Sequence, residues 1–208
     1  MNILGLDLSL NGPGFCPAPN VTASLKMETR DGDRRFVRIR DAVQHYVTTA
    51  PRLGYDLAVI ESVPGGSYST QALDGVHAVA REVLARYGVP YIYVPAPTLK
   101  AYATGDSRAE KVAMHDALPP RLRSVPRNDD EVDAWWLAAM GRAAGGDQEL
   151  WRRMPAHQID ALSKVTGWPA MLSPAPTGVS PKTEKCGHGY QCLRNAGHLV
   201  HPYLFDEC

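Results

Sequence analysis

Four carboxylates of this chain occupy positions where a fold would rather place apolar side chains. Asp7 interrupts the first apolar segment, and Glu61 ends a later one. Asp130 and Asp133 are three residues apart at the start of a predicted helix, so they share one face of it. A buried carboxylate costs several kcal/mol unless it is paired or bound to a cation. Together the four residues predict a site for divalent metal ions, which prefer oxygen ligands of this kind.

Most of these carboxylates also have a structural interpretation. A glutamate at a strand end, such as Glu61, is only mildly unusual. Asp129 or Asp130 beside Asn128 could simply complement the dipole of the helix that begins there. Asp133 is harder to explain in this way, because it directly precedes the sequence AWWL. We favour the metal site because all four acids occur together.

The elements that must position these acids follow from the spacing of apolar residues. The apolar run that ends at Glu61 suits a strand buried on both faces of a sheet. Strands that alternate with helices predict an α/β domain with a central, partly parallel sheet. We expect strands in 3–10, 21–28, 56–61 and 89–94, and helices over 33–50, 69–87, 98–103, 108–118 and 129–144.

The chain divides into three parts by composition. Residues 1–146 carry the alternating strands and helices and form the expected main domain. Residues 147–185 form an extension, with room for one or two short helices in 147–166 and a linker rich in Pro, Ser, Thr and Gly in 167–185. Residues 186–208 hold a cluster of cysteines and histidines.

Residues 3 to about 144 resemble a known family. The segments LGLDLS (4–9), VIE (59–61) and DEVDA (130–134) are similar in order and environment to those of the ribonuclease H-like superfamily. Within it they look most like the RuvC-type Holliday junction resolvases, particularly the shorter phage-borne versions. The segment PTLKAYATG (97–105), followed by AEK (109–111), resembles the lysine-bearing segment of these resolvases. The resemblance implies a ribonuclease H-like fold with a mixed sheet flanked by helices.

The same resemblance implies a metal-dependent DNA endonuclease that resolves four-way junctions and leaves 5′-phosphate and 3′-hydroxyl ends. Two Mg²⁺ or Mn²⁺ ions about 4 Å apart meet the needs of phosphodiester hydrolysis. Asp7 would bridge both ions, and Glu61 and Asp133 would hold one each. Asp130 would be a second ligand or would orient the attacking water.

Several residues are expected to contact DNA. The resemblance implies that Lys111 and Lys100 contact the scissile phosphate or its neighbour, with Arg108 beside them. Tyr68, in the loop after Glu61, is a candidate for base stacking. Solvated lysines and a tyrosine that packs at a helix start remain the alternatives.

Such resolvases act on branched DNA as homodimers, so we also expect a homodimer. The helix over 69–87 carries an apolar stripe that could form the dimer interface or simply the core. Trp135 and Trp136 are adjacent on one helix, and we do not expect both to face a single core. One of them is expected to meet the C-terminal helices or a partner. The residues of the stripe are Val76, Val79, Ala80, Val83 and Leu84.

The C-terminal cluster predicts a structural zinc site. Two thiolates and two imidazoles suffice for a tetrahedral ion, and a segment this small needs such a ligand to fold. His188 or Cys208 could replace one ligand, and a disordered or disulfide-linked tail is the alternative. The spacing resembles short zinc motifs at the ends of actinobacterial and phage proteins. The predicted ligands are Cys186, Cys192, His198 and His201.

Charge and hydropathy exclude further classes of protein. The chain has 22 basic and 22 acidic side chains, which excludes a polybasic protein that coats nucleic acid by bulk charge. Residues 98–127 nevertheless carry six basic and three acidic side chains, so a local basic face is expected. No apolar run is long enough for a membrane helix, and the start MNILGLDLSL lacks a signal-peptide layout. We therefore expect a protein of the bacterial or phage-infected host cytoplasm, without membrane partners.

Three other functions compete with junction resolution. The chain could cut flaps or other branched DNA during replication or packaging, or it could bind DNA without cutting it. An actin-like kinase or ATPase also begins with an aspartate in its first strand. That fold needs two large lobes and a second Gly-rich phosphate loop, which this chain lacks.

Overall fold

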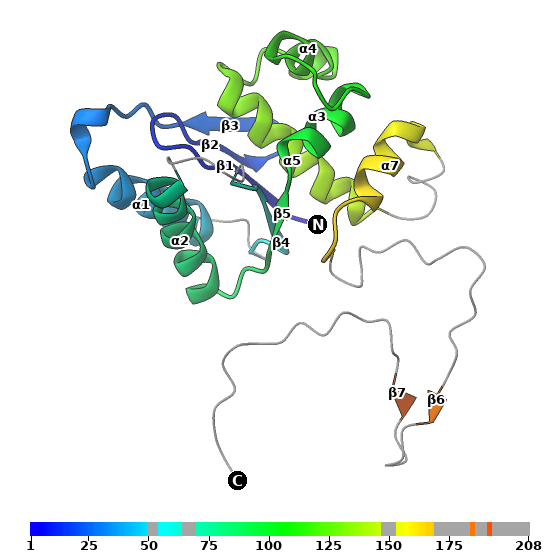
Figure 1. The fold of residues 1–208 in the computed structure, drawn as a ribbon, viewed down its shortest axis with the longest axis horizontal. Coiled ribbons are helices and arrows are strands. Elements are labelled where there is room, and N and C mark those ends of the chain that lie inside the picture. The colour runs from blue at the N-terminus through cyan, green and yellow to red at the C-terminus, as the bar shows by residue number, and fades with distance from the viewer. Residues whose placement is uncertain (50–53, 64–69, 147–152, 169–183, 186–190, 193–208) are drawn as a thin grey trace.

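A five-stranded mixed sheet forms the centre of the protein (Figure 1). The computed structural model describes residues 1–49, 54–63, 70–146, 153–168, 184–185 and 191–192. The strand order is β3-β2-β1-β4-β5, with β1 antiparallel to β2 and parallel to β4. The strands are β1 (Ile3–Asp7), β2 (Gly14–Ala18), β3 (Val21–Ser24), β4 (Leu57–Glu61) and β5 (Tyr91–Val94).

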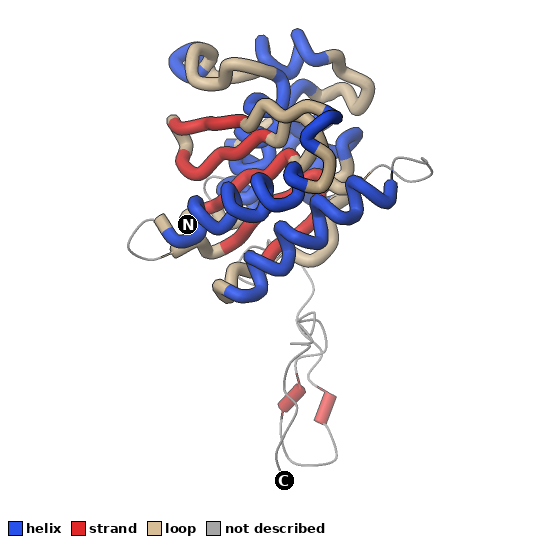
Figure 2. The backbone as a smooth tube through the Cα atoms, turned by 90° about the vertical axis from the view of Figure 1, so that its left-hand side faces the viewer, coloured by secondary structure: helices blue, strands red, loops and turns tan. Residues whose placement is uncertain are grey.

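Helices cover both faces of this sheet. On one face α1 (Arg34–Thr48) and α2 (Thr70–Arg86) lie side by side, in front of the strands in Figure 2. On the other face lies α5 (Asp129–Ala144), packed with α3 (Ala96–Thr104) and α7 (Ala156–Ser163). The remaining elements are α4 (Lys111–Asp116), the 3₁₀ turns η1 (Thr29–Asp31) and η2 (Pro120–Leu122), and the strand pair β6 (Glu184–Lys185) and β7 (Gln191–Cys192).

Side chains of β1 and β4 alternate between the two faces, as strand geometry requires. Leu4 and Leu6 pack with α1 and α2, whereas Ile3 and Val59 pack with α5. The centre of the sheet is therefore buried on both sides, which explains the near-continuous apolar runs of these strands.

The helix α5 lies directly on the backbone of β1. A Cβ atom added at Gly5 would stand 2.0 Å from the carbonyl oxygen of Ala134 and 2.9 Å from the amide nitrogen of Ala138. Only glycine permits this approach, and the small alanines of α5 complete it. This contact fixes where α5 lies along β1. It thereby also fixes the position of the acids at the N-terminal end of α5.

The predicted elements are confirmed with small shifts at their ends. The helix over 129–144 has the predicted bounds, and the described part of 147–166 contains the short helix α7. The strand β2 was not predicted, because Pro17 and the surrounding turn residues hide its period. It pairs with both β1 and β3, with a register irregularity between Phe15 and Ala18. Proline is tolerated in strands at such irregular positions.

The expectation for the two tryptophans was wrong. Trp135 and Trp136 are only 6% and 5% exposed, and both belong to the core cluster around α5. Their rings meet edge to face, with centroids 4.9 Å apart. Trp135 Nε1 donates to the carbonyl oxygen of Pro19, and Trp136 Nε1 donates to that of Met114. Both rings fit into one core because other elements pack against α5 on two sides.

The apolar stripe of α2 is part of the core of the chain itself. Val76, Ala80, Val83 and Leu84 are fully buried against the sheet. Of the two interpretations of this stripe, core packing is therefore correct for these four residues. Among the described residues, no helix has the length and apolar character to cross a membrane.

Candidate active site

Asp7 and Glu61 lie at the carboxyl ends of two neighbouring parallel strands. Leu6 is paired with Ile60 in the register of β1 and β4, and each acid follows by one residue. Alternation along the strands then turns both acids to the face that α5 covers. Two residues 54 positions apart in the chain are thus brought together by strand pairing.

Asp130 and Asp133 reach the same place from the first turns of α5. The helix begins at Asn128, whose Oδ1 accepts a hydrogen bond from the backbone nitrogen of Glu131 (2.9 Å). A Cβ atom at Gly14, opposite Asp7 in β2, would stand 2.0 Å from the carbonyl oxygen of Asp130. The N-terminal turn of α5 is therefore pressed against the strand next to Asp7.

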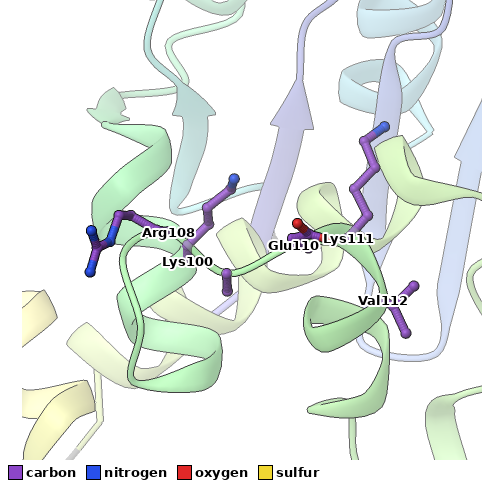
Figure 3. A pocket seen from close by; sticks show the side chains of 6 residues that line it. Lys100, Arg108, Glu110, Lys111 and Val112 are labelled. Carbon is purple, nitrogen blue, oxygen red and sulfur yellow. The ribbon is translucent and has the colours of Figure 1, made fainter.

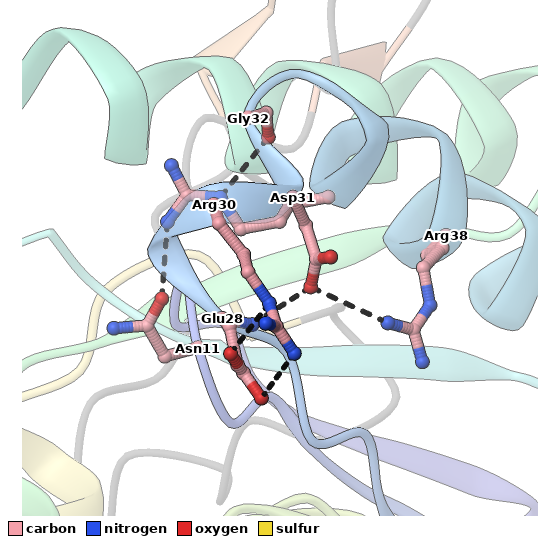
Figure 4. Close-up of polar contacts among 7 residues, drawn as sticks. Asn11, Glu28, Arg30, Asp31, Gly32 and Arg38 are labelled. Carbon is pink, nitrogen blue, oxygen red and sulfur yellow. Dashed lines mark hydrogen bonds and ion pairs between the residues drawn. The ribbon is translucent and has the colours of Figure 1, made fainter.

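The turn that follows β1 is hydrogen-bonded to the first turn of α1 and to the segment before that helix (Figure 4). Arg35 donates from Nη1 to Asn11 Oδ1 (3.0 Å), and the backbone nitrogen of Met27 donates to the carbonyl oxygen of Asn11 (2.8 Å). The backbone nitrogen of Glu28 in turn donates to Asp31 Oδ2 (2.8 Å). The first two bonds therefore tie Asn11, four residues after the end of β1, to this region, and the third stabilises η1.

The four acids act on one another electrostatically. Burial raises the pKa of Asp7 well above its usual range, and Glu61, Asp133 and Asp130 raise it further. Burial, with the charge of Asp133, raises the pKa of Glu61 from 4.5 to about 7. Burial also raises the pKa of Asp133 from 3.8 to about 6, and that of Asp130 is raised as well. The structure therefore brings all four predicted acids together in one cluster of negative charge.

The chemistry of this acidic cluster fits divalent metal ions. Four carboxylates that raise one another's pKa are stabilised in their charged form by a bound cation. As the side chains are placed, no three Asp, Glu, His or Cys residues in the described parts of the chain are close enough to hold an ion. Binding would therefore require rotation of these side chains toward a shared centre.

The raised pKa values predict how pH changes the stability of the metal-free protein. An acid whose pKa is higher in the folded state stabilises the fold at low pH, and this contribution is lost as pH rises through the folded value. We therefore expect the wild type to lose stability relative to Glu61→Gln between about pH 4 and about pH 7. Thermal melting in EDTA across this range measures the difference, and Mg²⁺ should reduce it at neutral pH. A difference that does not change with pH would contradict the assignment.

Two lysines lie beside the acidic cluster. Lys111, at the start of α4, forms an ion pair with Asp129 (Nζ to Oδ2, 2.9 Å). Its positive charge offsets part of the rise in the pKa of Asp7 and Asp133. The charge of Lys100, on α3, likewise offsets part of the rise in the pKa of Glu61. Both predicted lysines therefore stand within electrostatic reach of the acids.

A shallow cavity of about 380 Å³ opens next to these lysines (Figure 3). Lys100 and Lys111 extend from its wall toward the same side, whereas the side chain of Arg108 points away from them. A second cavity of about 260 Å³ is also lined by Lys111 and Val112, and it includes Arg127. The basic face expected from residues 98–127 is thus partly gathered around Lys111.

Some predicted residues lie outside the described parts of the chain. These are Tyr68, Cys186, His198 and His201. Cys192 is described only as part of the strand β7. The stacking and zinc predictions therefore stay predictions.

Sequence reasoning missed two residues near the site. Asp129 was interpreted only through the helix dipole, yet it holds Lys111. Glu131 was not singled out, yet it is a buried carboxylate with 3% exposure. The pattern Asn128-x-x-Glu131 is a signal for a helix start, but it does not show that the glutamate is buried.

Comparison with known proteins gives one sequence relative and a shared fold. No protein-family model matches the chain. It is 39% identical over 154 residues to the crossover junction endodeoxyribonuclease RuvC of Gloeobacter violaceus, a match that covers 68% of this chain and 87% of the relative.

Solved structures agree on the fold. A RuvC structure from Thermus thermophilus matches with a TM-score of 0.52 and 15% identity, covering 66% of this chain and 91% of that one. A second, of T. thermophilus RuvC in complex with a Holliday junction substrate, matches with a TM-score of 0.52 and 14% identity, covering 65% and 89%. The predicted ribonuclease H-like fold is therefore confirmed.

Proposed function

The chain belongs to the RuvC family of crossover junction endodeoxyribonucleases, and from this premise we propose that it resolves Holliday junctions by metal-dependent hydrolysis of DNA phosphodiester bonds. The observation that carries the proposal is the acidic cluster of Asp7, Glu61, Asp130 and Asp133. Their mutual effect on pKa supports a shared role in binding cations.

The residues of the acidic cluster would divide the work in the following way. Asp7 would be shared between two Mg²⁺ or Mn²⁺ ions, and Glu61 and Asp133 would each hold one of them. Asp130, in the first turn of α5, would complete the ligand set or orient the attacking water. When bound, the ions polarise the scissile phosphate and neutralise the charge of the leaving oxygen.

The lysines would hold the substrate next to the ions. The pair of Lys111 and Asp129 is exposed, with 71% and 51% of the two side chains accessible, so its attraction is weak. A DNA phosphate can therefore replace Asp129 as the partner of Lys111 at little cost. Lys100 would contact the neighbouring phosphate, and Arg108 would contact the backbone beyond it.

Branched DNA is the substrate that the comparisons support best. A solved RuvC of the same fold is in complex with a Holliday junction. The chain has no net charge, but metal ions would neutralise the acidic cluster and leave the basic face around Lys111 to attract DNA. We propose that the protein acts as a homodimer, so that two sites cut opposite strands of one junction.

A cleavage panel tests this function. Purified protein with Mg²⁺ or Mn²⁺ is incubated with a four-way junction, a flap and a linear duplex of the same sequence. We expect paired symmetric cuts in the junction and little cutting of the duplex. Glu61→Gln serves as the inactive control. Preferential cutting of the flap would replace junction resolution by flap cleavage, and no cleavage with either metal would reject the nuclease.

For the C-terminal part we propose a separate structural zinc site, as in the short motifs of phage and actinobacterial proteins. Residues 1–146 would form the nuclease domain, 147–185 the helical extension and linker, and 186–208 the zinc motif, in a protein of the cytoplasm. Purified protein should contain about one zinc per chain, and Cys186→Ser should lose it. Absence of stoichiometric zinc in the wild type would reject this site.

A further inference from the structure

Glu131 is a buried carboxylate that three donors approach. Its Oε2 accepts a hydrogen bond from Thr22 Oγ1 (2.7 Å) and another from the backbone nitrogen of Arg127 (3.0 Å). Its Oε1 accepts a hydrogen bond from Ser24 Oγ (2.8 Å). With 3% exposure it lies almost entirely out of solvent. A buried carboxylate is stable under these conditions because donors satisfy both of its oxygens.

These donors come from elements distant in the chain. Thr22 and Ser24 belong to β3, 109 and 107 residues before Glu131. Asn128 strengthens the link, since its Nδ2 donates to Ser24 Oγ (2.8 Å) while its Oδ1 caps the helix at Glu131. The network therefore ties the first turn of α5 and the segment before it to the edge strand of the sheet.

The same turn of α5 carries acids of the proposed metal site. Asp130 precedes Glu131 directly, and Asp133 follows it by two residues. On a helix Glu131 points about 100° away from Asp130, so it can contact β3 while the two aspartates face Asp7. The backbone of Asp130 already touches β2 at Gly14, so any shift of this turn would move the aspartates relative to β1.

We propose that Glu131 is a positioning residue that seats the first turn of α5 on β3 and so sets where Asp130 and Asp133 stand relative to Asp7 and Glu61. The inference rests on the proposed function, because it gives the seating of α5 a role in metal binding. The side-chain hydrogen bonds of Glu131 go to Thr22, Ser24 and the backbone of Arg127, so it would act on the site through the position of α5.

A carboxylate suits this network better than an amide, because both of its oxygens accept hydrogen bonds. An amide can keep its oxygen toward Thr22 and the backbone nitrogen of Arg127, but its NH₂ group then faces Ser24 Oγ, which must accept instead of donating. Alanine leaves all three donors without their partner and opens space beneath the turn. Glu131→Gln should therefore have a smaller effect than Glu131→Ala.

Direct metal binding is the first readout of the test. Mn²⁺ affinity is measured by isothermal titration calorimetry on wild type, Glu131→Gln, Glu131→Ala and the control Glu82→Gln, whose side chain is exposed on α2. We expect Glu131→Ala to weaken Mn²⁺ binding about 10-fold, the size seen for residues that orient metal ligands. Glu131→Gln should lie between it and the wild type, and Glu82→Gln should equal the wild type.

Junction binding and cleavage complete the test, at a temperature where circular dichroism shows every variant folded. The Mn²⁺ concentration for half-maximal cleavage should rise in step with the affinity, while metal-free binding of the junction stays unchanged. Thr22→Val and Ser24→Ala each remove one donor and replace Glu131→Ala if that variant does not fold.

The outcomes separate the two proposals. Variants that melt earlier but bind Mn²⁺ within about two-fold of the wild type would show a purely structural Glu131 and overturn the inference. A wild type that binds Mn²⁺ but cuts no junction would overturn the proposed function, and the Mn²⁺ affinities of the variants would still decide the role of Glu131. A wild type that binds no Mn²⁺ would overturn both.

Discussion

Replacement of Asp7 by asparagine should abolish junction cleavage while the protein still binds the junction. Asp7 is the acid whose pKa is raised by all three of the others, so it stands at the centre of their charge. An amide of the same shape removes the charge that two cations would share. We expect the cleavage rate to fall by on the order of 10³-fold, as when an electrostatic group of a catalytic site is deleted.

The same substitution should stabilise the metal-free protein at neutral pH. The charged form of Asp7 is disfavoured by burial and by like charges, and asparagine removes that penalty. Asp41→Asn, on the exposed surface of α1, is the matched control and should change neither cleavage nor melting temperature. A variant Asp7→Asn that keeps more than about a tenth of the wild-type rate would contradict the role of Asp7.

Replacement of Gly5 by alanine should destabilise the fold by about 3 kcal/mol, at the upper end for overpacking of a core. The added Cβ would stand 2.0 Å from the carbonyl oxygen of Ala134, which belongs to the backbone and cannot rotate away. The clash can be relieved only if α5 moves away from β1. Because Asp130 and Asp133 travel with α5, the fraction that remains folded should also cut junctions more slowly.

Gly12→Ala provides the matched control for this prediction. Its Cβ would stand 2.7 Å from Oδ2 of Asp130, which is the tip of a flexible side chain. The unfolding free energy of Gly12→Ala should therefore stay close to that of the wild type. Urea unfolding measures both variants, and a Gly5→Ala protein within about 0.5 kcal/mol of the wild type would refute the close seating of α5.

Local sequence patterns predict most of the secondary structure. Asn128 at the N-terminus and Gly145 after the C-terminus bound α5, and the predicted and observed ranges agree. The strand β2 was missed because its irregular register and Pro17 leave no regular alternation. Tertiary pairing with β1 and β3 stabilises it in spite of its local sequence.

The candidate site also combines features that local sequence patterns reveal with features that depend on tertiary contacts. A lone acid in an apolar strand is visible in the sequence, so Asp7 and Glu61 could be singled out without a structure. Their partnership with Asp133 depends on the register of β1 with β4 and on the seating of α5 at Gly5. Neither can be derived from local patterns, because both involve residues more than 50 positions apart.

Residue type and short-range spacing are therefore enough to identify most of the elements, the acids of the site and the family resemblance. Which polar and aromatic side chains are buried, and what they contact, follows from the packing of the folded chain. Trp135 and Trp136 share one core because α5 has neighbours on two sides. Glu131 is buried because β3 supplies donors from more than 100 residues away. The environment of a side chain is set by what packs against it, and in this fold those partners are distant in the chain.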